Sequence, residues 1–261
     1  MQSRPAYRHT LAALLLALPV ALPAADAAGP APAATPAQAP ASPAPAMTTL
    51  KPFSASYEVR LNNLPFRAEA RQTLAPLGND RWRLTLTVKS FLLDTTEYSE
   101  FRWDGAACHT IPERYGYSRN GIGRDKYLDM RFDFATGTLT RHDGRKSIGM
   151  KIGKGVEDKL GHSLAVACRV ARGARGQIGV DVAWDNDVRH FDYMVARTEE
   201  TIVTPLASYR ALRVERKRVD DDRVTATWLS AGAGWRTVRM QHSEGDGRLF
   251  QLQLLELNNG R

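Results

Sequence analysis

Residues 81–89, RWRLTLTVK, decide the fold class. The alternation in this stretch is strict: apolar Trp82, Leu84, Leu86 and Val88 stand between polar Arg83, Thr85, Thr87 and Lys89. Successive side chains of a β-strand point to opposite faces, so one face of this segment is apolar and the other is polar. The stretch therefore predicts a β-strand with one face against a core and one face in water.

The same period of two recurs along most of the chain. It is clearest in residues 53–61, 190–196, 223–230 and 248–257. Pairs such as Gly78-Asn79, Asp104-Gly105 and Asp143-Gly144 separate the alternating segments, and such pairs favour the positive φ of hairpin turns. Asp220-Asp221-Asp222 is interpreted as a charged hairpin tip, since it lacks the glycine and the distant glutamate of a calcium loop. We expect an all-β fold, a large curved antiparallel sheet or an open barrel.

One stretch departs from this period. Residues 155–173, GVEDKLGHSLAVACRVARG, carry an apolar face at helical spacing: Val156, Leu160, Leu164, Ala167 or Cys168, and Ala171. Acidic Glu157 and Asp158 come first and Gly173 comes last, as the dipole and the C-cap of a helix favour. The pattern predicts one principal helix between about Val156 and Arg172, packed on the sheet. Gly161 weakens such a helix, which indicates close packing at that position.

The chain has two cysteines, Cys108 and Cys168. In an oxidising compartment two cysteines tend to pair, so a structural disulfide is the favoured interpretation. Two buried thiols and a redox pair are the alternatives, although redox pairs usually occur as Cys-x-x-Cys.

The N-terminus reads as an export signal. Arg4 and Arg8 precede an apolar run at residues 11–25, and Ala25-Asp26-Ala27 fits a small-x-small cleavage site. The run of about 15 residues is shorter than the roughly 20 that a membrane-spanning helix needs. We therefore expect residues 1–27 to be a cleaved signal peptide, a periplasmic location, and no transmembrane segment in the mature chain.

Two further segments follow the signal. Residues 28–46 consist almost entirely of alanine and proline, which predicts a disordered linker. Residues 47–258 are long enough for one substantial core, so we expect a single β-rich domain there. The formal net charge of +8 falls to +7 without the signal. The positive residues alternate with others instead of clustering, so we expect no nucleic-acid partner.

Four parts of the chain share features with a known family: "PFSASYEVRLNNLPFRAEA", "TTEYSEFRW" with "IPERYGYSR" and "LDMRFDF", "GVEDKLGHSLAV", and "ERKRVDDDRVTATWLSAGAGWRTVRMQHSEGDG". Through these stretches, residues 52–257 resemble bacterial envelope proteins of the domain of unknown function 3108 family. In the third stretch Asp158 and Leu160 fit the family, and Gly161 stands where a serine is common. The resemblance implies export and an all-β envelope protein. It implies no reaction, cofactor or ligand.

The sequence contains no catalytic signature. Asp158 and His162 are one helical turn apart and could share a face, for which metal or acid–base use and a hydrogen-bonded helix surface are both possible interpretations. Ser163 sits beside His162 on the helix and cannot face it, and no Gly-x-Ser-x-Gly motif is present. Glu199 and Glu200 are adjacent in a strand pattern, so they point to opposite faces. We expect no catalytic residues, no metal site and no cofactor.

Three functions are compatible with these sequence features. The first is a non-enzymatic envelope protein whose apolar interior binds an amphipathic ligand, such as a lipid, or another envelope component. The second is a structural or assembly factor of the envelope with a filled core and no ligand cavity. The third is a cell-wall or polysaccharide hydrolase, which requires two carboxylates that meet in a cleft. The oligomeric state is not predicted.

Overall fold

The structure, a computed structural model, describes residues 47–62, 67–91, 93–121, 123, 125–217, 223–244 and 247–260. Its elements, all in one compact unit, are β1 (Phe53–Leu61), β2 (Arg67–Gly78), β3 (Arg81–Lys89), β4 (Leu93–Asp104), β5 (His109–Gly121), β6 (Lys126–Asp133), β7 (Thr138–His142), β8 (Ser147–Lys151), α1 (His162–Ala171), β9 (Gly176–Ala183), β10 (Val188–Val195), β11 (Glu200–Val203), β12 (Ser208–Lys217), β13 (Val224–Ser230), the 3-10 turn η1 (Ala231–Ala233), β14 (Arg236–Ser243) and β15 (Leu249–Asn259).

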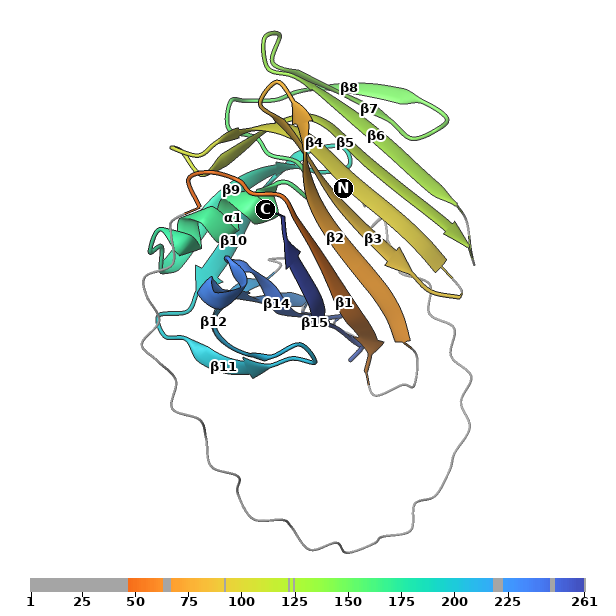
Figure 1. The fold of residues 1–261 in the computed structure, drawn as a ribbon. Coiled ribbons are helices and arrows are strands. Elements are labelled where there is room, and N and C mark those ends of the chain that lie inside the picture. The colour runs from red at the N-terminus through yellow and green to blue at the C-terminus, as the bar shows by residue number, and fades with distance from the viewer. Residues whose placement is uncertain are drawn as a thin grey trace, which may run out of the picture. The chain divides into compact units, whose positions relative to one another are not determined.

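The strands form one antiparallel sheet that does not close into a barrel. Its order is β8-β7-β6-β5-β4-β3-β2-β1-β15-β14-β13-β12-β10-β9, and β11 pairs with β12 outside this path. Most neighbours in the sheet are also neighbours in sequence. The exception at the centre is β15, which returns from the C-terminal end to pair with β1. The all-β prediction with one principal helix is confirmed (Figure 1).

The strand predictions match the elements closely, because the alternation reports burial directly. β1 and β3 occupy the predicted residues, and in β3 Leu84 is fully buried while Lys89 is exposed. The turn between β2 and β3 has positive φ at Gly78, Asn79 and Asp80, as the sequence of this turn favours.

The helix begins later than the sequence predicts. α1 starts at His162, and the segment before it is not helical. The backbone of Glu157 pairs in parallel with Val182 of β9, since its N–H donates to Asp181 and its carbonyl accepts from Ala183. The prediction of a helix from Val156 is therefore wrong at its N-terminal end, because a long-range strand contact takes the backbone groups that a first turn would use.

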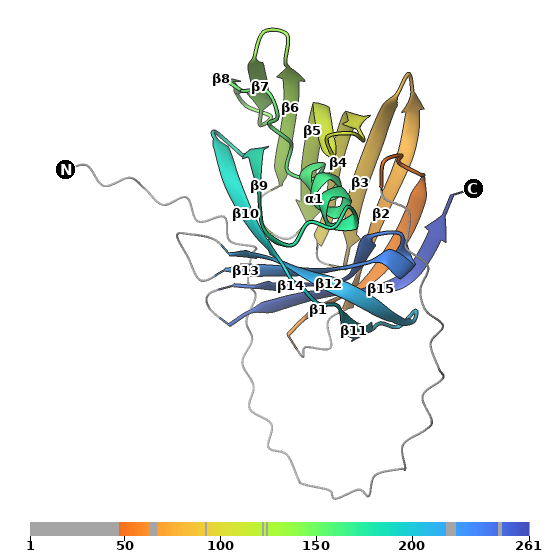
Figure 2. The same ribbon diagram turned by 90° about the vertical axis from the view of Figure 1, so that its left-hand side faces the viewer.

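The prediction of a single apolar face is also wrong. The buried residues of α1 are Leu164, Ala165, Val166, Ala167, Cys168 and Val170, which leave hardly any exposed side. The reason is its position: α1 packs against both β5 and β9, and the curved sheet passes around it (Figure 2). The helix thus fills the concave side of the sheet and forms part of the core.

Some predictions concern residues outside the described ranges. These are the signal peptide at residues 1–27, the linker at 28–46 and the hairpin tip Asp220-Asp221-Asp222. Within the described part of the chain, no helix has the length and apolarity to cross a membrane.

Candidate functional site at the two ends of the helix

The two cysteines lie at disulfide distance, with their Cα atoms 5.5 Å apart. Cys168 is near the C-terminal end of α1 and Cys108 precedes β5. Cys108 belongs to the turn between β4 and β5, directly before β5 begins, and has a positive φ of 51°. The pair connects the end of the helix to the β4–β5 hairpin.

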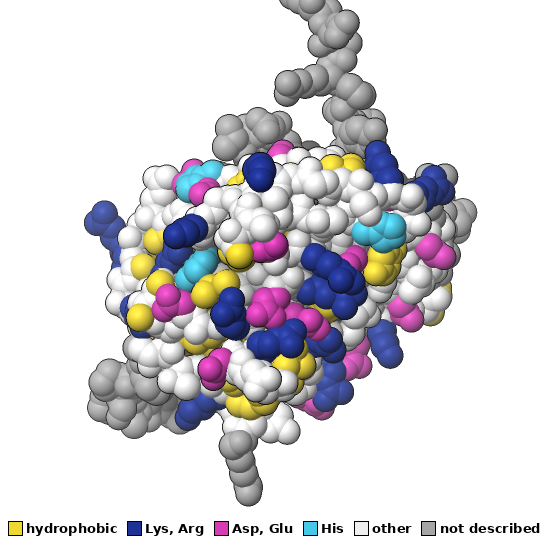
Figure 3. All heavy atoms as spheres, turned by 90° about the horizontal axis from the view of Figure 1, so that it is seen from above, with side chains coloured by type: hydrophobic (Ala, Val, Ile, Leu, Met, Phe, Trp, Pro, Cys, Tyr) yellow, Lys and Arg dark blue, Asp and Glu magenta, His cyan; other side chains and the backbone are white. Residues whose placement is uncertain are grey.

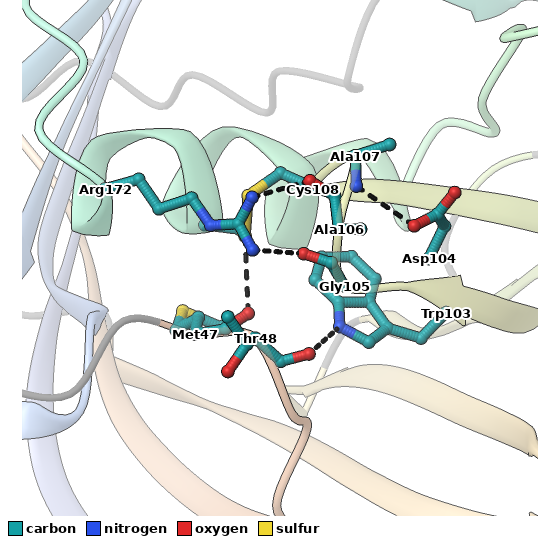
Figure 4. Close-up of a disulfide and its surroundings, with 10 residues drawn as sticks. Met47, Thr48, Trp103, Asp104, Gly105, Ala106, Ala107, Cys108 and Arg172 are labelled. Carbon is teal, nitrogen blue, oxygen red and sulfur yellow. Dashed lines mark hydrogen bonds between the residues drawn. A yellow bond between two sulfur atoms is a disulfide. The ribbon is translucent and has the colours of Figure 1, made fainter.

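Arg172, directly after the helix, contacts the same turn (Figure 4). Its guanidinium donates to the carbonyl oxygen of Ala106 at 2.6 Å and also to that of Gly105. The C-terminal end of α1 is therefore attached to one hairpin turn by the cysteine pair and by two charge-assisted hydrogen bonds.

The first described residues pack against this attachment. The carbonyl oxygen of Thr48 accepts a hydrogen bond from Nε1 of Trp103 at 3.2 Å (Figure 4). The carbonyl oxygen of Met47 lies 3.3 Å from Sγ of Cys168. A side chain at Gly105 would place its Cβ 1.8 Å from the Thr48 oxygen, so only glycine fits there. The segment before β1 thus lies against both the cysteine pair and the hairpin turn.

Asp158 organises the other end of the helix. Its side chain is fully buried and accepts hydrogen bonds from the N–H groups of Leu160 and Gly161, at 2.8 and 2.7 Å. The hydroxyl of Ser99 on β4 donates to the same carboxylate at 2.5 Å. Burial raises the pKa of Asp158 to about 6, although these hydrogen bonds oppose the rise.

Glu157 is the second buried carboxylate. It is 0 % exposed and accepts a hydrogen bond from the hydroxyl of Thr110 at 2.5 Å, and its other oxygen lies 2.9 Å from Nδ1 of His109. Both partners belong to β5. The loop before α1 is thus fixed to β4 and β5 by two carboxylates that each have their own partners.

Gly161 lies between these groups. A Cβ added there would meet Oδ2 of Asp158 at 2.8 Å, and the hydroxyl oxygens of Ser99 and Thr110 at 3.0 Å. The close packing that the sequence indicated at this position is confirmed. A serine at this position would crowd the Asp158 carboxylate and the two hydroxyl groups.

His162 does not pair with the carboxylate of Asp158. Its Nδ1 lies 3.0 Å from the backbone carbonyl oxygen of Asp158, and its Nε2 lies 2.8 Å from the hydroxyl of Tyr193 on β10. Burial lowers the pKa of His162, which favours the neutral imidazole. The two residues are therefore joined by a hydrogen bond from the imidazole to the backbone of Asp158. This contact lies inside the curved sheet and not on an exposed helix surface.

A third carboxylate, Glu97 on β4, completes the polar interior. It accepts a hydrogen bond from the hydroxyl of Tyr115 at 2.5 Å, and burial raises its pKa despite nearby Lys159. The Nζ atom of Lys159 pairs with Asp185 and lies 4.4 Å from the ring centroid of Trp184. The cluster therefore contains acid–base groups, each with a protein partner.

The other residues considered in the sequence analysis, Ser163, Glu199 and Glu200, each contact another protein group. The hydroxyl of Ser163 donates to the carbonyl oxygen of Leu160 at 2.7 Å. Glu200 accepts a hydrogen bond from Trp228, and Glu199 lies 3.6 Å from Arg210. In the described ranges no group of three or more His, Cys, Asp or Glu side chains could hold a metal ion.

Sequence reasoning missed the partners on β4 and β5. Every second residue of β4 faces the core. Read backwards along the strand, these residues are Phe101, Ser99 and Glu97. Polar residues at apolar positions of a period-two pattern are the signal that could have identified them, because each needs a hydrogen-bonding partner in the core.

No protein-family model matches the chain, and no curated protein matches it either. The resemblance to the domain of unknown function 3108 family stays a prediction.

Proposed function

We propose that the protein is an exported, non-enzymatic protein of the bacterial envelope, of the domain of unknown function 3108 family. It binds its partner, a lipid or another envelope component, through the outer surface of its sheet. The observation that carries this proposal is the position of α1, which fills the concave side and is attached at both ends to the β4–β5 hairpin.

The filled interior argues against a ligand on the concave side. An amphipathic ligand needs an apolar cavity that buries most of its surface. Leu164, Val166 and Val170 of α1 occupy that volume and belong to the same core cluster as the strands. Ligand entry would require the helix to leave, against the contacts at both of its ends.

A surface hollow in the described part of the chain lies elsewhere. It has a volume of ≈ 410 Å³ and lies among β1, β2, β15 and the β11–β12 turn. Three of its seven lining residues are charged: Glu58, Arg60 and Glu69. The hollow is open to solvent, so it does not replace the enclosed interior cavity that the first of the three functions requires.

The buried carboxylates support a non-enzymatic role. A glycoside hydrolase needs two carboxyl groups on either side of a scissile bond. Glu157 and Asp158 instead accept hydrogen bonds from Thr110, Ser99 and the loop backbone. These hydrogen bonds fix the loop before α1 to β4 and β5.

Native mass spectrometry of the protein extracted from the envelope tests the proposal. We expect a second species above the mass of the mature chain, either a lipid or a partner protein. An unrelated exported protein of similar charge, taken through the same extraction, is the control. A mass equal to that of the chain alone would contradict the proposal and favour a purely structural role.

Export is tested separately. N-terminal sequencing of the mature protein is expected to begin at or near Ala28, after the predicted cleavage site. A mature, soluble protein that retains Met1 would contradict export.

A further inference from the structure

Five arginines lie together on the outer face of the sheet. They come from four neighbouring strands: Arg81 and Arg83 on β3, Arg102 on β4, Arg114 on β5 and Arg131 on β6. We call these five residues the arginine face. Since neighbouring strands are about 4.8 Å apart, the four strands spread the guanidinium groups over roughly 15 Å.

Three carboxylates pair with these arginines. Glu100 pairs with Arg81 and Arg83, Glu113 with Arg81 and Arg102, and Asp129 with Arg114 and Arg131. The side chains of Glu100 and Asp129 are each 9 % exposed and that of Glu113 is 32 % exposed, whereas those of the arginines are 37 to 69 % exposed. These residues together carry a positive surplus, and the arginines are more exposed than the carboxylates that pair with them.

The strand register places like charges opposite each other. Arg81 stands directly across from Arg102, and Arg114 across from Arg131. Like charges at opposite positions of two strands are destabilising. A sequence that retains two such pairs on one face departs from local stability rules, and departures of this kind are expected at functional sites.

An aromatic ring positions two of the five arginines. The ring of Tyr98 lies between two of the guanidiniums, at 5.3 Å from Arg83 and 5.7 Å from Arg114. The Tyr98 ring lies over Gly116, where an added Cβ would be 2.2 Å away. The planar donors are thereby pre-positioned, which lowers the ordering cost of binding.

We propose that the arginine face binds the phosphate groups of an anionic lipid surface. Arginine forks match phosphate oxygens, and five of them spread over four strands suit several headgroups better than one small anion. The exposed guanidinium groups of these arginines can contact such a surface. In the view from above, Lys and Arg side chains lie next to Asp and Glu side chains near the middle of the molecular surface (Figure 3). The proposal rests on the proposed function and names its partner.

Co-sedimentation with vesicles tests the proposal. Purified mature protein is mixed with vesicles of phosphatidylcholine alone, or with about 30 % phosphatidylglycerol added, at low salt and at about 0.15 M salt. We expect binding to the anionic vesicles only, and weaker binding at the higher salt. The double variant Arg102→Gln/Arg131→Gln should bind roughly tenfold or more weakly, since each charge near the surface contributes separately.

The double variant should fold, because Glu113 keeps Arg81 and Asp129 keeps Arg114 as partners. The matched control is Arg189→Gln/Arg210→Gln, which removes the same charge from exposed positions on β10 and β12. Equal weakening in both variants, or no binding by the unmodified protein, would overturn the proposal. If vesicles fail to bind while native mass spectrometry finds a partner protein, the lipid proposal falls and the proposed function stands.

Discussion

At the scale of single residues, the loop before α1 shows what sequence can and cannot predict. The close packing at Gly161 was predictable, because glycine in a helical pattern needs a reason. The partners of Asp158 were not, since Ser99 lies 59 residues away in sequence. The sequence suggested a shared face for Asp158 and His162, yet the imidazole contacts the carbonyl of Asp158 and not its carboxylate.

The raised pKa of Asp158 gives a pH-dependent stability. Its pKa is about 6 in the folded protein and 3.8 ordinarily, so the folded state holds a proton that the unfolded state has lost between these values. The stability from this group is fully present below about pH 3.8 and is lost as the pH rises through about 6. At roughly 1.4 kcal/mol per pKa unit, the loss is about 3 kcal/mol.

Asp158→Asn should remove this dependence, because the amide oxygen can still accept from the N–H groups of Leu160 and Gly161. The unfolding free energy of the variant, relative to the unmodified protein, should rise by about 2.4 kcal/mol from about pH 4 to about pH 7 in urea titrations. Asp143→Asn is the control with opposite sign, because backbone N–H groups lower the pKa of that carboxyl. A difference for Asp158→Asn that does not vary with pH would show that burial does not hold the proton on this group.

At the scale of elements, strands were more predictable than the helix. Alternation is a local property, so β1 and β3 follow from the sequence alone. The start of α1 depends instead on the contact between Glu157 and Val182 of β9, which no local pattern reports. The nearly complete burial of α1 depends on how the sheet curves around it, which is also a long-range property.

The attachment of the helix predicts the state of the cysteines. Denatured, unreduced protein from an oxidising compartment should show no free thiols, because Cys108 and Cys168 lie at disulfide distance. The bond would close a loop of 60 residues, so Cys108→Ala/Cys168→Ala should lower the unfolding free energy by up to roughly 4 kcal/mol. Two free thiols per chain would show that the pair is not bonded.

The burial of α1 predicts a strong effect at Leu164. Leu164→Asp places an unpaired charge in the core and should cost several kcal/mol, about 3 or more, measured as a large fall in Tm. Ser163→Asp is the matched control, because Ser163 is exposed and a negative charge suits the first turn of a helix. Equal Tm values for Leu164→Asp and the unmodified protein would mean that the helix does not pack inside the sheet.

At the scale of the whole molecule, composition and periodicity predicted an all-β protein with one helix packed on the sheet, but not how completely that helix is buried. The return of β15 to β1 joins the N-terminal and C-terminal halves of the sheet, and sequence spacing alone does not encode that pairing. The expected apolar interior exists, and the protein's own helix fills it. For this reason we propose that binding occurs on the outer face.

Hydrogen exchange tests the filled interior most directly. With the cysteine pair intact, the amides of Leu164 to Val170 should exchange only through global unfolding, as slowly as those at the centres of β4 and β5. Exchange should be followed by mass spectrometry at neutral pH in the absence of reductant. Rapid exchange across α1, while β4 and β5 remain protected, would show a helix that leaves the concave side and would contradict a permanently filled interior.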